Sequence, residues 1–145
     1  MDLEERIMLA IVRISESFKK KNSALFKQNG LTFSQYNVLR ILESAETGRM
    51  SISEIGNMML VSGANMTGIV RRLEKVGFIA IERLKSDERV KLLSIQPMGR
   101  AVLKEIQGKK DTNNQDYLNA FSSARKRKFL NDLVTVLKSV SLDAE

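Results

Sequence analysis

The feature that most constrains the fold is a segment, residues 62–76, whose start and end are both marked in the sequence. Ser62 suits an N-cap position, because its hydroxyl can accept a hydrogen bond from a backbone N–H that has no partner within the helix. Gly77 followed by Phe78 is typical of a left-handed C-cap with an apolar residue folded back on the last turn. Apolar residues recur between these ends at spacings of three and four, which predicts one inward helix face. They are Met66, Ile69, Val70, Leu73 and Val76.

Beyond Gly77 the apolar period changes from that of a helix to that of a strand. Residues 78–81 alternate, residues 82–88 are mostly charged or turn-like, and residues 90–95 resume an extended apolar pattern. This order predicts two strands joined by a basic tip. Pro97 then suits the first turn of another helix, because that position needs no N–H donor.

Three helices are predicted upstream of residue 62. The first ends near Gly30. Residues 32–35 and 51–54 each pair a hydroxyl residue with Gln or Glu three positions later, a capping box that starts the second and third helices. Residues 44–50 are predicted to be a loop, and the third helix should stop near Leu60. The apolar stripe of the first helix is Ile7, Ile11, Ile14, Phe18 and Leu25.

The C-terminal part is also predicted to be helical. The helix that starts at Pro97 should continue through Val102 and Ile106. Residues 107–116 are polar and form either a solvated helix or a break. Ser122 or Ser123 caps a last helix. Its apolar face is Phe129, Leu133, Val136 and Val140. The fold class is therefore mainly α with a small β wing.

The composition excludes several kinds of site. The chain has 145 residues and contains neither Cys nor His. Without Cys it can form no disulfide, thiolate metal site, cysteine nucleophile or thiol redox sensor. Without His it can form neither a Ser-His-Asp triad nor a histidine-ligated zinc site. We therefore expect a protein that is not an enzyme and that uses no metal or cofactor.

The charge balance favours a polyanionic partner. The chain has 24 Lys and Arg against 17 Asp and Glu, a formal net charge of +7. Residues 62–100 hold eight of the basic and four of the acidic residues, which is more than half of the excess charge. The first twenty residues place acidic residues where a secretory signal would carry its basic region, and no apolar run reaches the roughly 18 residues that span a bilayer. We expect a cytoplasmic protein with no membrane partner.

The outer face of residues 62–76 suits a DNA major groove. Such a face needs small and polar side chains near the helix start, where the backbone approaches base edges, and cations further along to meet phosphates. The residues off the apolar stripe meet both needs in order. They are Ser62, Gly63, Ala64, Asn65, Thr67, Gly68, Arg71, Arg72 and Lys75.

The order of the elements predicts a winged helix-turn-helix. Two short helices meet at residues 60–62, and a basic hairpin follows the second of them. The hairpin residues 83–91, called the wing below, should lie against the DNA backbone or in a minor groove. The start of the third helix offers N–H donors and partial positive charge, so Ser51 and Ser53 are predicted phosphate contacts.

Four short motifs resemble the MarR family of bacterial regulators. Residues 31–103 carry the likeness, and the flanking helices agree only in length and order. The motifs are QYNVL at 35–39, RLEK at 72–75 with GFI at 77–79, DER at 87–89, and IQPMG at 95–99. The Asp-x-Arg spacing ten residues after Gly77 is the most specific of them.

The resemblance implies roles for the wing. Arg89 would enter a minor groove and Asp87 would hold its guanidinium in place. Relatives usually have Arg where this chain has Ile81, and Arg83 could substitute for it from the same strand face. Relatives also often have Thr at the position of Gln96. The remaining predicted DNA contacts of the wing are Arg83, Lys85 and Lys91.

The resemblance further implies a homodimer that binds double-stranded DNA at a pseudo-palindrome and acts as a repressor. Residues 1–145 would form a single domain, with a DNA-binding lobe at 31–96 and dimerisation helices at 1–30 and 97–145. A small aromatic or anionic effector would bind between lobe and helices and favour a dimer with wrongly spaced recognition helices. Candidate pocket residues are Phe18, Phe26, Tyr36 and Met58.

Two other functions remain open at this point. A winged helix can hold a protein partner, and such an interaction module would show no steeply salt-dependent DNA binding. A small hydrolase or transferase is more distant, because the acidic residues form no recognisable catalytic motif.

Overall fold

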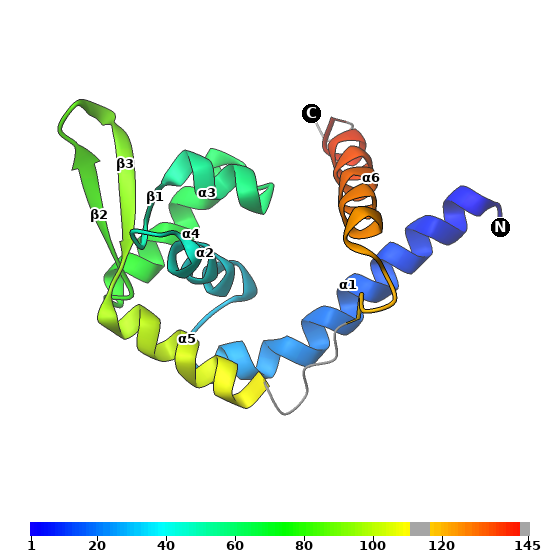
Figure 1. Cartoon of the computed structure of the whole chain (residues 1–145), viewed down its shortest axis with the longest axis horizontal. Helices are drawn as coiled ribbons and strands as arrows, with labels where there is room; N and C mark the ends of the chain where they lie inside the picture. Colours follow the sequence, from blue (N-terminus) through cyan, green and yellow to red (C-terminus); the bar gives the residue numbers. More distant parts are fainter. Residues whose placement is uncertain (111–116, 143–145) are drawn as a thin grey trace. The chain divides into compact units, whose positions relative to one another are not determined.

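The computed structural model describes residues 1–110 and 117–142, which divide into two compact units, one within residues 1–111 and one within 112–145. The described residues are mainly helical, with a three-stranded antiparallel sheet, as the sequence predicts. The first unit contains, in chain order, α1 (Leu3–Gln28), α2 (Phe33–Ser44), β1 (Arg49–Ser51), α3 (Ile52–Met59), α4 (Gly63–Lys75), β2 (Ile79–Leu84), β3 (Asp87–Ile95) and α5 (Pro97–Lys110) (Figure 1). The second contains α6 (Ser123–Leu142).

The predicted capping boxes are confirmed. At the start of α2 the Gln35 N–H donates to Thr32 Oγ1 at 3.2 Å, and the Thr32 N–H donates to Gln35 Oε1 at 2.9 Å. A further capping box, between Asp2 and Glu5, starts α1. The first helix ends where the sequence predicts, with Gly30 in the left-handed region at φ +71°. Local side-chain chemistry therefore sets these helix ends.

The sheet has the strand order β1-β3-β2, and the predicted hairpin is its β2–β3 pair. In Figure 1 the tip of this hairpin extends beyond the helices. The prediction of a loop at 44–50 is wrong at its end, because Arg49 and Met50 begin β1 and pair with Ser94 and Leu93. Ser51 both ends β1 and caps α3. A three-residue strand is too short to show an alternating pattern.

The core of the first unit joins α2, α4, β3 and α5. Leu39, Leu73, Leu93 and Leu103 come from these four elements and are completely buried. Val76, predicted to face inward, is 43% exposed, because it is the C-cap residue and lies beyond the last turn of α4. Because α5 supplies core residues, the lobe packs as a unit that reaches beyond residue 96.

The second unit is described from Tyr117 onward. Of the two predicted capping residues, Ser122 caps α6, since its Oγ accepts the Arg125 N–H at 3.2 Å. In this unit the rings of Phe121 and Phe129 meet edge to face, with centroids 5.8 Å apart. Of the segment 107–116, residues up to Lys110 are helical and the others lie outside the described residues. Within the described chain, no helix is long and apolar enough to cross a membrane.

Candidate nucleic-acid interface

The turn between α3 and α4 is tight. Leu60 adopts the left-handed conformation at φ 57°, and the Val61 N–H donates to the Gly56 carbonyl at 3.0 Å. A Cβ at Gly56 would lie 3.2 Å from Met66 Cγ and 3.3 Å from the Val61 carbonyl oxygen. Because an added methyl group would press on both neighbours, Gly56 allows α3 to pack closely on α4.

Ser62 occupies the N-cap position of α4 but does not cap it with its side chain. Its backbone is extended and its carbonyl accepts the Met66 N–H at 3.0 Å, whereas its hydroxyl makes no capping hydrogen bond. The predicted capping bond of Ser62 is therefore wrong, although the predicted helix start is right. Backbone geometry alone defines this start, and the exposed hydroxyl leaves the first N–H groups of α4 without a side-chain cap.

The outer face of α4 is open along its whole length. At its start, a Cβ on Gly63 or Gly68 would meet nothing within 4 Å. Thr67 Oγ1 donates to the Gly63 carbonyl at 3.1 Å. All nine residues predicted for a groove are exposed, namely Ser62, Gly63, Ala64, Asn65, Thr67, Gly68, Arg71, Arg72 and Lys75. The helix thus exposes small and polar side chains at its start and cationic side chains at its end.

The C-terminal end of α4 is fixed as the sequence predicts. Gly77 has φ +79°, its N–H donates to the Glu74 carbonyl at 3.0 Å, and the Phe78 N–H donates to the Leu73 carbonyl at 3.0 Å. These two bonds form a Schellman motif. They lead the chain directly from α4 into β2.

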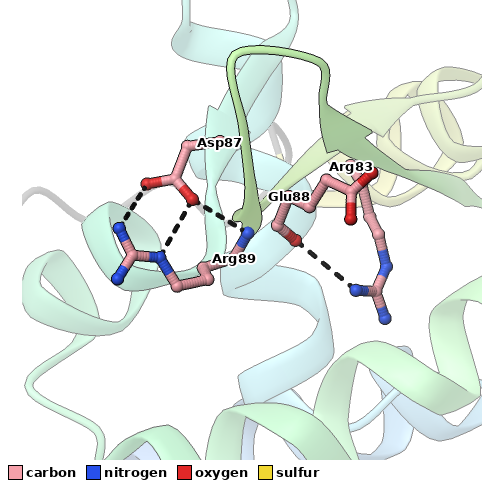
Figure 2. Close-up of polar contacts among 4 residues, drawn as sticks. All are labelled: Arg83, Asp87, Glu88 and Arg89. Carbon is pink, nitrogen blue, oxygen red and sulfur yellow. Dashed lines mark hydrogen bonds and ion pairs between the residues drawn. The ribbon is translucent and has the colours of Figure 1, made fainter.

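In the wing, the Asp87 carboxylate accepts two side-chain hydrogen bonds from the Arg89 guanidinium, an arrangement called the fork below (Figure 2). Asp87 Oδ1 accepts the Arg89 Nε–H at 3.1 Å, and Oδ2 accepts an Nη2–H at 3.2 Å. The backbone N–H of Arg89 also donates to Oδ1, at 3.1 Å. These hydrogen bonds hold the pKa of the Asp87 carboxyl below its usual value. The Arg89 side chain is 91% exposed, so its remaining donors face outward.

Arg83 is held differently. Its Nη1 donates a single long hydrogen bond, 3.4 Å, to the Glu88 carbonyl oxygen, and Figure 2 shows its guanidinium pointing away from that of Arg89. Ile81, the position at which the resemblance implies Arg, packs against the core. The last two predicted wing cations, Lys85 and Lys91, are exposed.

At the start of α3, the predicted phosphate contacts differ from each other. The Ser51 hydroxyl and N–H both donate to Glu54 Oε2, at 2.6 and 3.0 Å, and these bonds lower the pKa of the Glu54 carboxyl. A phosphate at Ser51 would therefore have to displace a carboxylate. Ser53 is exposed. At Ser51, the predicted capping box and the predicted phosphate contact would therefore use the same two donors, the hydroxyl and the backbone N–H.

Three of the four predicted pocket residues belong to one cluster of rings. Phe26 and Tyr36 are buried and stacked with centroids 4.5 Å apart. Phe18 joins them through Phe33, which sequence analysis missed, with centroid distances of 5.4 and 5.7 Å to Phe18 and Phe26. The spacing of Phe33 and Tyr36, three residues on one helix, was the available signal. Met58 is 60% exposed on α3 and is not part of this cluster.

Comparison with known proteins finds similarity to one family. Residues 31–91 match the model of the MarR family. The transcriptional activatory protein BadR of Rhodopseudomonas palustris is 27% identical over 103 residues, 70% of this chain but only 59% of BadR. The HTH-type transcriptional regulator FarR of Neisseria gonorrhoeae is 24% identical over 134 residues, 92% of this chain and 90% of FarR.

Solved structures agree on the fold. The structure of reduced AbfR bound to DNA superposes with a TM-score of 0.77 at 23% identity, covering 95% of this chain and 94% of AbfR. The matched family segment contains the α3–α4 turn, all of α4, and the wing with its Asp87–Arg89 fork. Residues 31–91 thus match the MarR family, and the relatives and solved structures support a MarR-family winged-helix regulator.

Proposed function

We propose that this protein is a transcriptional regulator that binds a pseudo-palindromic operator as a homodimer and represses by occupying a promoter. The observation that carries the proposal is the open face of α4 beside the outward-facing Arg89 of the wing. Its relative FarR is named a transcriptional regulator and BadR a transcriptional activatory protein, and AbfR is described bound to DNA.

In this proposal, α4 enters a major groove. Asn65 and Thr67 lie near its exposed start, where side chains can reach base edges. Arg71, Arg72 and Lys75 follow on the exposed surface and meet phosphates. Arg89 enters the neighbouring minor groove, with its planar guanidinium held by Asp87.

A homodimer would cover apolar surface that the single chain exposes. On α1 the exposed apolar residues are Leu3, Ile7, Met8, Leu9, Val12, Ile14 and Phe18. On α6 they are Phe129, Leu130, Leu137 and Val140. Apolar surface of this extent marks an interface with another protein. The dimerisation region is thus proposed on α1 and α6, and two α4 helices would read half-sites about one DNA turn apart.

An effector site is proposed at the ring cluster of Phe18, Phe26, Phe33 and Tyr36. Phe18 and Phe33 are 38% and 39% exposed, above the buried rings of Phe26 and Tyr36. A small aromatic anion could stack there and favour a dimer whose α4 helices are wrongly spaced for DNA. Titration with benzoate, followed by thermal unfolding and by operator release, tests this site.

The decisive experiment is a gel-shift titration against the DNA that flanks the protein's own gene. It should be run at several salt concentrations, with random duplex of the same length as competitor. Preference for the flanking DNA supports a regulator. Equal affinity for both duplexes would contradict the proposal, and absence of DNA binding would favour a protein-interaction module.

A further inference from the structure

Two basic side chains of the wing lie directly opposite each other. In the β2–β3 pairing, Arg83 is the register partner of Lys91. Directly opposed residues of antiparallel strands have Cβ atoms about 4.5–5.5 Å apart, so like charges at such positions destabilise the hairpin. The alternate pairs toward the core, Ile81 with Leu93 and Ile79 with Ile95, lie on the same face of the hairpin and are apolar. The cation pair therefore continues the core-facing side of the hairpin past the edge of the core.

No acidic side chain compensates this pair within the described residues. Neither Arg83 nor Lys91 forms an ion pair with a carboxylate there. Glu82, next to Arg83 on β2, forms its ion pair with Arg49 of β1. Arg83 bonds only to the Glu88 carbonyl oxygen, which fixes its direction without neutralising its charge. A like-charge pair in this setting is suited to an anion placed between or above the two side chains.

We propose that Arg83 and Lys91 together form a phosphate-binding pair that anchors the wing on the DNA backbone, while Arg89 alone reads the minor groove. This inference rests on the proposed DNA binding and assigns different tasks to the wing cations. A phosphate demands positive charge, which Lys supplies as well as Arg. A groove reader demands the planar fork that Asp87 holds.

The contrast between the two arginines supports this division. Arg89 makes three bonds to Asp87 and is 91% exposed, so one orientation is selected before DNA arrives. Arg83 makes one bond of 3.4 Å and can adjust to a phosphate whose position varies with sequence. Rigid placement suits recognition in a groove, and loose placement suits the backbone.

The test measures affinity for operator and random duplex against salt concentration. Substituting both Arg83→Gln and Lys91→Gln should lower the slope of log affinity against log salt by about 3.6 for the dimer, since four phosphate contacts are lost and each contributes about 0.9. Affinity for both duplexes should fall by the same factor. Arg83→Lys should keep the wild-type slope. Thermal unfolding without DNA should occur at the same or higher temperature in the double variant, because a like-charge repulsion is removed.

Lys104→Gln on the exposed face of α5 is the matched control for lost charge and should leave the slope unchanged. If wild-type protein binds no DNA, the proposed function itself fails. If wild-type protein binds but the double variant keeps its slope, or changes only the preferred sequence, the phosphate pair is refuted. An Arg83→Lys variant as weak as Arg83→Gln would also refute it.

Discussion

The Asp87 carboxylate accepts hydrogen bonds from the Arg89 guanidinium through both of its oxygens, yet the Arg89 side chain stays 91% exposed. An exposed ion pair contributes little to the stability of a fold. Its effect here is to select one orientation of a side chain that would otherwise sample many. The fork therefore prepares the wing for a ligand.

Asp87→Asn should weaken operator binding by about tenfold without lowering the unfolding temperature. An amide can accept only through its single oxygen, so the Arg89 fork loses one of its two arms. Gel shift and thermal unfolding measure the two effects. Glu88→Gln, which leaves the Glu88 backbone carbonyl in place, is the control. A variant that binds like wild type would show that the orientation of Arg89 does not matter.

Operator affinity should be constant between about pH 6 and pH 8 at fixed salt. The chain contains no His, the side chain that usually titrates in this range. The Arg89 bonds lower the pKa of the Asp87 carboxyl, so their contribution is present above the usual carboxyl range near 3.9. It is lost only as pH falls through the lowered value. Titrations at three pH values check this, and a clear change across the range would point to another titrating group.

Gly56→Ala should be less stable than Gly68→Ala by about 1–3 kcal/mol, since its new methyl group would crowd Met66 and the Val61 carbonyl while both changes gain the helix preference of alanine. Gly68→Ala is the matched change on α4, where the methyl group meets open space. It should raise stability by up to about 1 kcal/mol, because alanine favours a helix. Urea unfolding measures both. Equal stability of the two variants would contradict the close packing of α3 on α4.

Gly68→Ala also tests the groove contact. If α4 lies in a major groove with its small exposed side chains toward the bases, the added methyl group should weaken operator binding while the protein becomes more stable. Gel shift with the stabilised variant measures this. Unchanged affinity would move the predicted base contacts away from Gly68.

Ile14→Glu in α1 should convert a dimer into a monomer and abolish tight operator binding. Ile14 is 65% exposed in the single chain, so the change should not unfold the first unit. Light scattering measures the mass, and circular dichroism checks the helices. Arg13→Ala, on the neighbouring exposed position, is the control. A variant that stays dimeric would exclude this part of α1 from the interface.

Sequence alone predicts those parts of this fold that depend on neighbouring residues. The capping boxes at Thr32 and Ser51 and the Schellman motif at Gly77 are made within a few residues, so their patterns are visible in the chain. β1 was missed because its only strand partner, β3, lies more than forty residues further on. Pairing at such a distance leaves no local pattern.

The same distinction holds for the candidate site. Asp87 and Arg89 are two residues apart, and their contact was expected from the resemblance of residues 87–89 to the MarR family. The bond from Arg83 to the Glu88 carbonyl depends on the irregular register after Arg83, which no pattern of side chains reveals. Met58 shows the limit of helical periodicity, since an apolar residue on a short helix can face either the core or the solvent.

Ser51 has a mechanical consequence. It ends β1, which pairs with β3, and caps α3, so the sheet passes into the helix pair at Ser51 without a loop, as it also does where Gly77 leads α4 into β2. A displacement of the wing on DNA would therefore be passed through the sheet directly to α3 and α4.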